Sequence, residues 1–450
     1  AVPEVALGSR VVEGLAERWP DVARVDVTRP EPERARSWLR LARGHGLGAG
    51  GRSVVLAPAP SLSLLVLDDE HHPSYKEDRS PRYDARVLAE RRAAIQGAAC
   101  VFVSTTPSVE LAGRAKRGDL GWVGPSRAVE RDRRPPVELV ETDPDRQLGG
   151  VLHGRIRDTL RAGGRVGLLV PRSGFARAVW CAECRRSLRC PVCEAGLVYA
   201  REDGVVRCPR CSFRAAPPDV CPTCGGVDFR FLGAGSERLA EQIGAAFPRA
   251  RVVRMDPAVL ETHGSAGVAD AQIYVTTWIG VKETLRPEVE LVGVLAVDHL
   301  VRRPEWRAGE RAYQALAEMA EWAGPTGRLL VQTDEPRHHA IQAVVRGSYR
   351  FFAERELEQR RELGYPPFSE LVKVRASGDR AQEGIAAAAE ACRAAGARVL
   401  GPIAVTASDG GRALEILAKA SSGQEVARSL RSLAADPPDG ARMQFDVDPR

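Results

Sequence analysis

Residues 181–226 read CAECRRSLRCPVCEAGLVYAREDGVVRCPRCSFRAAPPDVCPTCGG and hold most of the ten cysteines of this 450-residue chain. The cysteines fall into four C-x-x-C pairs: Cys181/Cys184, Cys190/Cys193, Cys208/Cys211 and Cys221/Cys224. Each pair presents two thiolates on one tight turn, and two pairs complete the tetrahedral sulfur shell that zinc prefers. The spacing therefore predicts two structural Zn²⁺ sites, with dithiol redox chemistry as the weaker alternative.

A predicted hairpin decides how the pairs combine. Residues 197–207 read LVYAREDGVVR, and the Asp-Gly step favours a tight turn between two strands. A nested arrangement brings the inner pairs together as zinc 2, formed by Cys190, Cys193, Cys208 and Cys211. The outer pairs then close zinc 1, formed by Cys181, Cys184, Cys221 and Cys224. Sequential pairing would crowd neighbouring knuckles around one metal, so nesting is favoured.

Patterns typical of parallel α/β structure flank the cysteines on both sides. Short apolar runs alternate with amphipathic stretches, at 22–27, 53–57, 62–72 and 100–107, and again at 166–171, 251–256, 273–277, 291–298 and 328–333. Such runs between helices indicate parallel strands buried on both faces. The Pro/Arg-rich stretch 130–138 is interpreted as a linker. From residue 346 the order becomes β-α-β-β-α-β, which predicts a small α+β domain of split-βαβ type.

Composition excludes several classes of protein. Hydrophobic residues make up 44% and charged residues 28% of the chain, which is typical of globular proteins and excludes wholesale disorder. No apolar run reaches the ~18–20 residues of a membrane helix, and the first residues lack a signal-peptide pattern. We therefore expect a cytoplasmic protein without a membrane partner. The formal net charge of +6 is a weak pointer to an anionic partner.

An acidic motif follows a buried strand in the first block. Residues 62–86 read LSLLVLDDEHHPSYKEDRSPRYDAR, so Asp68, Asp69, Glu70 and His71 come directly after the apolar run. Acids at the carboxyl ends of parallel strands lie at the mouth of a sheet, where P-loop ATPases bind Mg²⁺-nucleotide. Alone, such a cluster is a solvated strand end about as often as a catalytic site.

Together with the cysteine module between two α/β blocks, this motif resembles the primosomal replication-restart helicase family (primosomal protein N-prime). The family's acidic strand reads D-E-E-H-D-x-S-Y-K-Q and then P-R-Y-H-A-R, against DDEHHPSYKE and PRYDAR here. The resemblance extends over VSTTPSVE (103–110), EWRAGERAYQ (305–314) and LGYPPFSELVKVRAS (363–377). It implies an α/β fold of two RecA-like parallel-sheet lobes with an inserted double-zinc module and a small α+β C-terminal domain.

The expected boundaries follow the patterns and the resemblance. They are a first lobe over 1–128, a linker and the start of the second lobe over 129–180, the two-zinc insertion over 181–226, the rest of the second lobe over 227–345, and the C-terminal domain over 346–450. In the family, the P-loop and an amino-terminal DNA-binding region precede the segment that matches AVPEVAL (1–7). No Gly-Lys dipeptide occurs here, so we expect a fragment without the P-loop.

The resemblance also implies roles for individual residues. Asp68 would meet the Mg²⁺ of bound ATP, Asp69 would stand at the catalytic base position, and Glu70 and His71 would couple the lobes to the nucleotide. A loop that senses DNA is matched by Tyr75, Lys76, Arg82, Tyr83 and Arg86. Stacking and phosphate contact are its physical rationale, and a packed tyrosine pair with surface bases is an equally weighted alternative. Two roles, a contact between the lobes or a contact with the nucleotide, remain open for Trp306, Arg307, Glu310, Arg311 and Gln314.

Several nucleotide-contacting positions depart from the family's pattern. Asp69 replaces a glutamate, and Trp322 and Pro325 stand where the arginine-finger motif Q-V-A-G-R-A-G-R carries its arginines. The stretch TTWIGVKE (276–283) keeps Lys282 without the family's glycines, and Ala296 replaces an aspartate. Because an arginine finger is worth ~10³–10⁵ in rate, we expect ATP hydrolysis to be weak or lost.

Three functions remain open at this point. The favoured one is a degenerate replication-restart protein that binds forked or single-stranded DNA and recruits primosome proteins and single-stranded-DNA-binding protein. The second is an active ATP-dependent 3′→5′ DNA helicase whose P-loop lies upstream of this chain. The third is a zinc-ribbon interaction protein with no role on DNA. Hydrolysis of ATP stimulated by forked DNA distinguishes the second from the first.

Overall fold

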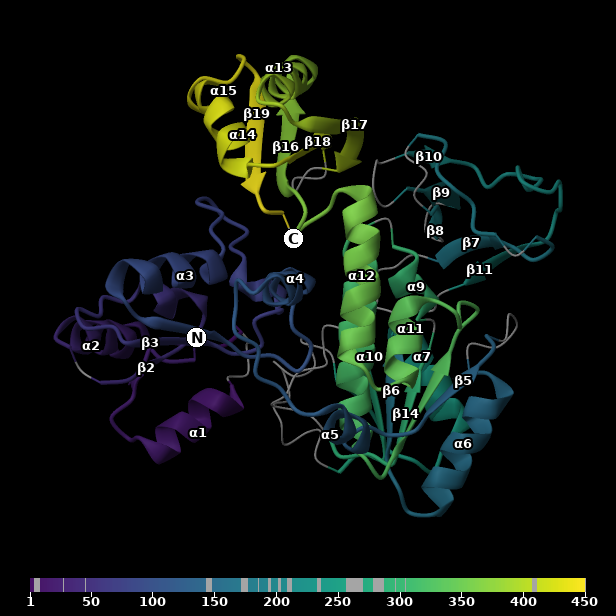
Figure 1. The fold of residues 1–450 in the computed structure, drawn as a ribbon. Coiled ribbons are helices and arrows are strands. Elements are labelled where there is room, and N and C mark those ends of the chain that lie inside the picture. The colour runs from purple at the N-terminus through teal and green to yellow at the C-terminus, as the bar shows by residue number, and fades with distance from the viewer. Residues whose placement is uncertain are drawn as a thin grey trace.

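The largest element of the structure, a computed structural model, is a six-stranded parallel sheet (Figure 1). The structure describes residues 1–3, 9–26, 28–44, 46–142, 148–170, 177–184, 186–192, 196–200, 204–208, 213–232, 236–255, 270–277, 287–295, 297–303, 305–406 and 411–449. The sheet has the order β12-β13-β6-β14-β15-β5. Its strands are β5 (Val137–Val140), β6 (Val166–Val170), β12 (Val252–Met255), β13 (Ile273–Thr277), β14 (Leu291–Val294) and β15 (Arg328–Gln332).

Helices cover both faces of this sheet, which is why its central strands are buried throughout. Strands β6, β13 and β14 are buried at every position, as the continuous apolar runs predicted. The surrounding helices are α6 (Gly150–Arg161), α7 (Ser236–Ala246), α9 (Asp298–Val301), α10 (Ala308–Ala323), α11 (His339–Val345) and α12 (Tyr349–Leu363). The successive residues Leu168 and Leu169 point to opposite faces, one toward α6 and α7 and the other toward α10.

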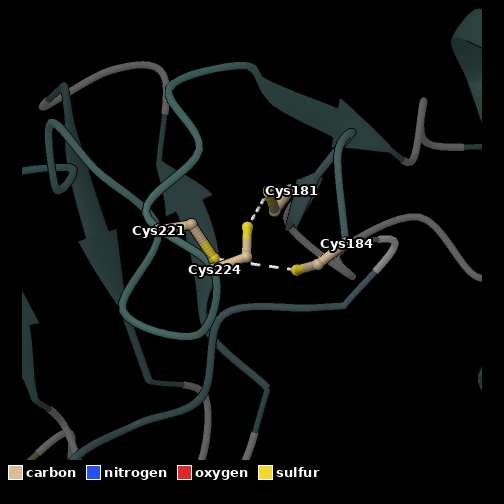
Figure 2. Close-up of side chains that lie close together, drawn as sticks. All are labelled: Cys181, Cys184, Cys221 and Cys224. Carbon is tan, nitrogen blue, oxygen red and sulfur yellow. Dashed lines mark hydrogen bonds between the residues drawn. The ribbon is translucent and has the colours of Figure 1, made fainter.

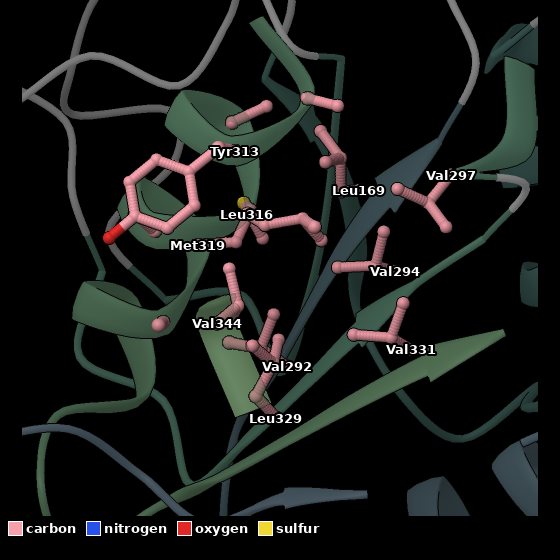
Figure 3. Packing of buried hydrophobic residues seen from close by; sticks show 14 of the residues in the cluster. Leu169, Val292, Val294, Val297, Tyr313, Leu316, Met319, Leu329, Val331 and Val344 are labelled. Atoms are coloured by element: carbon pink, nitrogen blue, oxygen red, sulfur yellow. The ribbon is translucent and has the colours of Figure 1, made fainter. Parts of the chain in front are cut away.

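The larger core lies under α10, α11 and α12. Figure 3 shows Leu316 and Met319 of α10 packed against Val292, Val294 and Val331 of the sheet. The sequence interpretation missed one element of this block, the edge strand β5. Val137 follows two prolines in the stretch that was interpreted as a linker, and the same stretch begins inside α5 (Arg127–Asp132). Edge strands tolerate an adjacent proline, because one side of the strand forms no ladder.

The first α/β block contains two short parallel strand pairs joined by the start of the chain. The pairs are β1 (Ala23–Arg24) with β2 (Gly48–Ala49), and β3 (Leu64–Leu67) with β4 (Ala99–Phe102). The N–H of Val2 donates to the carbonyl of Gly50, and the N–H of Asp68 donates to the carbonyl of Ala1, at 2.9 Å each. Residues 1–2 therefore bridge β2 and β3.

The helices of this block follow the expected amphipathic stretches. They are α1 (Arg10–Arg18), α2 (Glu31–Ala42), α3 (Ala85–Gln96) and α4 (Val109–Arg117). The apolar run at 53–57, expected as a strand, is instead the short 3₁₀ helix η1 (Arg52–Leu56). It follows Gly50 and Gly51, and the N–H of Val54 donates back to the carbonyl of Gly51, so this short run closes a turn rather than pairing in a sheet.

Helix α4 joins the first block to the second. Val109 belongs to the core under α10, and a Cβ atom added at Gly113 would lie 2.7 Å from Cγ of Pro367. The glycine thus lets α4 approach α12 and the loop that follows it. Figure 1 places α4 beside the upper part of α12, close to the C-terminal domain.

The cysteine region forms a five-stranded antiparallel sheet of order β10-β9-β8-β7-β11. Its strands are β7 (Arg177–Cys181), β8 (Val198–Ala200), β9 (Val205–Arg207), β10 (Arg214–Ala215) and β11 (Phe229–Leu232). The predicted hairpin is present as the pair β8 and β9. Because β7 pairs with β11, Cys181 lies opposite Phe229, and the two ends of the region lie side by side.

The C-terminal region is an antiparallel sheet of order β17-β18-β16-β19 packed on helices. Its elements follow the expected β-α-β-β-α-β order: β16 (Glu370–Gly378), α13 (Ala381–Ala394), β17 (Arg398–Thr406), β18 (Arg412–Ala420), α14 (Gly423–Ser429), α15 (Arg431–Ala435) and β19 (Ala441–Val447). Ala404 of β17 also packs against the core of the cysteine region. Within the described ranges, none of the helices combines the length and hydropathy of a transmembrane segment.

Candidate functional site

The outer cysteines form a compact four-sulfur cluster (Figure 2). The Sγ atoms of Cys181, Cys184, Cys221 and Cys224 all lie within 4.8 Å of one another. The distance from Cys181 Sγ to Cys224 Sγ is 3.6 Å, and from Cys184 Sγ to Cys221 Sγ it is 3.8 Å. A tetrahedron with Zn–S bonds of ~2.3 Å has sulfur–sulfur edges of about 3.8 Å, so the cluster fits a zinc ion.

The backbone around the cluster favours the thiolate at Cys221, whereas desolvation and the neighbouring sulfur atoms raise the pKa of the Cys184 and Cys224 thiols. The N–H of Thr223 points at Cys221 Sγ and the N–H of Gly226 at Cys224 Sγ, each at 3.4 Å. Desolvation raises the pKa of the Cys221 thiol, but the backbone N–H groups of Thr223 and Cys224 outweigh it and bring the pKa to about 6. Four thiolates with all coordination positions filled make a structural site and leave no open position for substrate.

The inner cysteines are only partly described. Cys190 and Cys208 are both buried and belong to the same apolar cluster, which also contains Val179, Leu188 and Val206. Their intended partners, Cys193 and Cys211, lie outside the described residues. The described part of the chain therefore supports one zinc site, and the second site stays a prediction.

The acidic motif lies where β3 ends, as the sequence indicated. Asp68 and Asp69 are half-buried, and Asp69 has a φ of +46°, in the left-handed region. Aspartate is one of the few residues enriched in that conformation, so it suits this backbone. Glu70 is buried, and its carboxylate accepts hydrogen bonds from the N–H and the hydroxyl of Ser108.

His71 is held beside the loop that precedes α4. Its Nδ1 lies 2.7 Å from the hydroxyl oxygen of Ser104. Burial and the charge of Arg86 lower the pKa of His71 to about 4, although the carboxylate of Glu310 acts in the opposite direction. His71 is therefore a neutral imidazole at physiological pH.

The residues that matched a DNA-sensing loop are mostly buried and paired in this structure. Tyr75 is fully buried and its hydroxyl donates to the carbonyls of Ala1 and Asp68. Arg86, also buried, donates to both carboxylate oxygens of Asp84 and to the carbonyl of Glu70.

The remaining members of that loop reach the C-terminal domain. The Lys76 ammonium is buried, donates to the carbonyl of Val447, and lies 3.0 Å from a carboxylate oxygen of Asp446. Arg82 and Tyr83 are partly exposed, and Arg82 lies 3.8 Å from Asp446. Contact of these five residues with DNA stays a prediction. The geometry shows a loop anchored between the first block and β19.

A buried cluster of charges connects α4, α10 and α12. The N–H of Val109 donates to Glu310 Oε1 at 2.9 Å, and Arg307 donates to Glu310 at 2.6 Å. Arg360 donates to Glu310 and to Glu356, at 2.9 Å each. Arg307 also pairs with Glu110 of α4. Arg307 and Glu310, left open between lobe and nucleotide contacts, thus contact the first block.

The charges in this cluster stabilise one another. Burial lowers the pKa of Arg307 and of Arg360, but Glu110 and Glu310 outweigh burial and raise both above the usual arginine range. Burial raises the pKa of Glu310, yet Arg360 and Arg307 hold it well below its usual range. Sequence reasoning missed Glu110 and Arg360. Glu110 ends the matching stretch 103–110, Arg360 lies outside the matching stretches, and neither has a pattern of its own that indicates pairing.

Curated proteins similar to this chain decide the family. Replication restart protein PriA of Treponema pallidum is 32% identical over 470 aligned residues, which cover 100% of this chain and 72% of that protein. The chain belongs to the PriA replication restart protein family. The family expected from the acidic motif and the cysteine array is confirmed.

Other PriA proteins show the same similarity. PriA of Bacillus subtilis is 30% identical and covers 90% of this chain, and PriA of Thermotoga maritima is 30% identical and covers 83%. The chain spans 53% and 52% of those two proteins. Residues 361–450 match the family model of the primosomal protein N C-terminal domain.

Solved structures give weaker similarities. Dbp5 of S. cerevisiae bound to RNA and ADP BeF3 has a TM-score of 0.37 and 10% sequence identity, covering 76% of this chain and 80% of that chain. A DEAD box protein from Methanococcus jannaschii has a TM-score of 0.31 and 7% identity, covering 77% of each chain.

The departures from the PriA pattern occupy different environments. Trp322 is buried in the core under α10, with its ring 3.0 Å from the place of a Cβ atom at Gly167. Pro325 is exposed in the turn after α10. Lys282 and Ala296 lie outside the described residues.

Proposed function

We propose that this chain acts in replication restart by binding forked or single-stranded DNA and recruiting replication proteins, with ATP hydrolysis weak or absent. The observation that carries the proposal is the match of the whole chain to a PriA protein combined with the buried tryptophan at position 322. The two α/β blocks would be RecA-like lobes over 1–128 and 129–345, interrupted by the zinc insertion at 181–226 and followed by the domain at 346–450. The setting would be the cytoplasm, with primosome proteins and single-stranded-DNA-binding protein as partners.

The proposed weak hydrolysis follows from three side chains. An arginine finger neutralises charge on the γ-phosphate and is worth ~10³–10⁵ in rate, and neither Trp322 nor Pro325 carries a charge. Trp322 is buried in the core beside Gly167 of the sheet. Asp69 is one methylene shorter than the family's glutamate, and misplacement of a catalytic group by ~1 Å can cost ~10²-fold.

Asp68 is the residue that would hold magnesium if ATP binds. It is half-buried at the carboxyl end of a parallel strand, where carboxylates meet Mg²⁺-nucleotide in this class of sheet. The ion would supply charge neutralisation to the phosphates when bound. Glu70 and His71 would convey to α4 whether a nucleotide is bound, through their contacts with Ser108 and Ser104.

The zinc ions would be structural, two per chain. Zinc 1 would join the ends of the insertion through Cys181, Cys184, Cys221 and Cys224, and zinc 2 would join the hairpin through Cys190, Cys193, Cys208 and Cys211. The geometry of the first cluster supports the first site. The insertion has a small core of its own, so tetrathiolate centres would supply much of its folding free energy.

An active helicase is the second candidate function, and one observation favours it. The contacts of Glu70 with Ser108 and of His71 with Ser104, through which the acidic motif would couple to α4, are formed.

Binding of forked DNA by the 450-residue chain, and ATP hydrolysis by a longer protein that carries a P-loop ahead of these 450 residues, test the proposal together. We expect fork binding in moderate salt and no increase in ATP hydrolysis on adding the fork. Fork-stimulated hydrolysis that disappears in Asp68→Asn but persists in the control Asp78→Asn would establish the helicase instead. Failure to bind either forked or single-stranded DNA would refute the DNA role altogether.

A further inference from the structure

The segment from Arg114 to Arg134 is the connection between the two blocks and is unusually basic. It holds seven Lys or Arg residues and three acids, so its formal charge is +4 in a chain whose total is +6. All side chains from Lys116 to Val129 are exposed except that of Leu120, which is half-buried. Positive charge is therefore concentrated on one accessible stretch.

An exposed tryptophan lies in the middle of this stretch. Trp122 is 53% exposed, and Val123 beside it is fully exposed. The Trp122 ring is nearly parallel to that of the buried Tyr349, at an interplanar angle of 8° and a centroid distance of 6.1 Å. This is an offset-stacked arrangement, in which Tyr349 fixes the orientation of a ring that remains half open to solvent.

Basic side chains gather near the ring on the first turns of α12. Arg350 follows Tyr349 directly and donates to Glu354 at 2.9 Å. The pKa of Glu354 lies below its usual range because of this hydrogen bond and because Lys116 and Arg127 lie close to it. Asp119 pairs with Arg117, and Asp132 lies 3.6 Å from Arg131, so some bases are matched while the stretch keeps its positive excess.

We propose that residues 116–131 form a contact site for single-stranded DNA, in which one base stacks on Trp122 and Lys116, Arg127 and Arg131 contact phosphates. The proposal rests on the DNA-binding part of the proposed function. An oriented, half-exposed ring among bases is the arrangement that binds unpaired nucleotides, because every base has a face to stack and every linkage has a charge. Bases of a duplex are already stacked and do not offer that face.

An acidic polypeptide is the competing occupant for a basic stretch. It would satisfy the charges without needing the ring, since glutamate and aspartate side chains cannot stack on it. The fixed orientation of Trp122 over Tyr349 therefore favours a nucleotide.

Binding of a fluorescently labelled twenty-nucleotide oligo(dT) to the 450-residue chain tests the ring. Trp122→Ala is expected to weaken binding by about 5- to 100-fold, and Trp122→Phe, which keeps an aromatic face, by much less. Trp19→Ala is the matched control, since Trp19 is 52% exposed just after α1, and it should leave the affinity unchanged. Thermal unfolding of each variant verifies that the fold is retained.

The salt dependence of the same titration tests the bases. The double variant Arg127→Ala/Arg131→Ala is expected to reduce the slope of log K against log salt by about 1.4, because each lost phosphate contact on a single strand removes about 0.7. The exposed pair Arg36→Ala/Arg43→Ala serves as its control and should not change the slope.

The outcomes separate this site from the proposed function. Oligo(dT) binding by the parent that is unaffected by Trp122→Ala and by the arginine pair overturns the site while leaving a DNA role elsewhere. Absence of binding in the parent overturns both. Equal loss in Trp122→Ala and Trp122→Phe overturns base stacking on the ring. Competition by poly-glutamate that depends on Arg127 and Arg131 but not on Trp122 assigns the stretch to an acidic polypeptide.

Discussion

Glu310 of α10 accepts the backbone N–H of Val109, the first residue of α4, at 2.9 Å. Glu70 accepts the preceding N–H, that of Ser108, so the two carboxylates come from different α/β blocks and meet at one helix N-terminus. Unpaired N–H groups at a helix start attract negative charge. Helix α4 is therefore held from both sides, and the acidic motif is connected to α10 through it.

Replacing Glu310 with glutamine tests this connection. Arg307 and Arg360 would each lose a buried charged partner, and breaking a buried ion pair by removing one partner costs about 3–5 kcal/mol. We expect a loss of that size in the free energy of unfolding measured in urea. Glu305→Gln removes the partly exposed pair with Arg311 and should stay within about 0.5 kcal/mol, and equal effects of the two would contradict the buried cluster.

The loss of stability in acid should depend on the Glu310 carboxylate. The folded pKa of Glu310 lies well below its usual range, so its contribution is complete above the unfolded pKa of about 4.3 and is lost as the pH falls below that value. The parent should therefore lose stability in acid more steeply than Glu310→Gln. Parallel curves for the two proteins below pH 4.3 would refute the assignment.

Two histidines should make the free energy of unfolding depend on pH between about 4 and 6.5. Burial first of all lowers the pKa of both His71 and His338 to about 4. The unfolded chain binds their protons near pH 6.5 while the folded chain does not, so the free energy of unfolding falls as the pH drops from 6.5 to about 4. His71→Asn and His338→Asn should each flatten this dependence in urea titrations at several pH values, and their double variant should add the two effects.

The ion pair of Lys76 with Asp446 should be stronger than its neighbour. Both side chains are nearly buried, whereas Arg82, the other partner of Asp446, is 29% exposed and 3.8 Å away. A double-mutant cycle with Lys76→Met and Asp446→Asn should give a coupling free energy of about 1–3 kcal/mol. The cycle with Arg82→Ala should give less than about 1 kcal/mol, and a reversed order would argue against the anchored loop.

Metal content provides the direct test of the cysteine cluster. Elemental mass spectrometry of the purified chain should give two zinc ions, and Cys221→Ser should give one. Cys100→Ser, at a thiol outside the cysteine region, should leave the content unchanged. Loss of all zinc in Cys221→Ser would mean that the two sites fold as one unit, and no zinc in the parent would refute both.

Restoring arginine at position 322 should not restore an ATPase. The side chain would enter a closed apolar core beside Gly167, and burying an unpaired charge costs several kcal/mol. We expect Trp322→Arg to unfold at markedly lower urea concentration and to show no gain in ATP hydrolysis. Trp19→Arg, at an exposed site, should be neutral, and a stable, hydrolysing Trp322→Arg protein would show that the position faces nucleotide.

Much of the fold could be predicted because its signals are local. The apolar runs at 166–171, 273–277 and 291–298 became central parallel strands, and an Asp-Gly step marked the β8–β9 hairpin. One short element was predicted wrongly and one edge strand was missed. Residues 53–57 close a 3₁₀ turn on Gly51 instead of pairing, and β5, which reads Val-Glu-Leu-Val at a sheet edge, contains no continuous apolar run that would mark it.

The candidate site was predictable in its chemistry and less so in its contacts. Cysteine spacing indicated the cluster of Cys181 and Cys224, because knuckles carry their geometry in a few adjacent residues. Glu110 and Arg360 are far apart in sequence, and only the packing of α4 on α12 brings them together. The same holds for Lys76, whose residue type suggested a phosphate contact while its actual neighbours come from the end of the chain.

The contact between Lys76 and the carbonyl of Val447 joins residues 371 positions apart. At ribosomal rates of about 5–20 residues per second, Lys76 is added to the chain roughly 20–75 s before its acceptor is made. During that interval the loop after the acidic motif lacks its contacts with β19 and depends on those that Tyr75 and Arg86 make within the first block. A chain that ends before β19 never forms the contact of Lys76 with Val447. Proteases and chaperones would therefore encounter an incompletely folded protein.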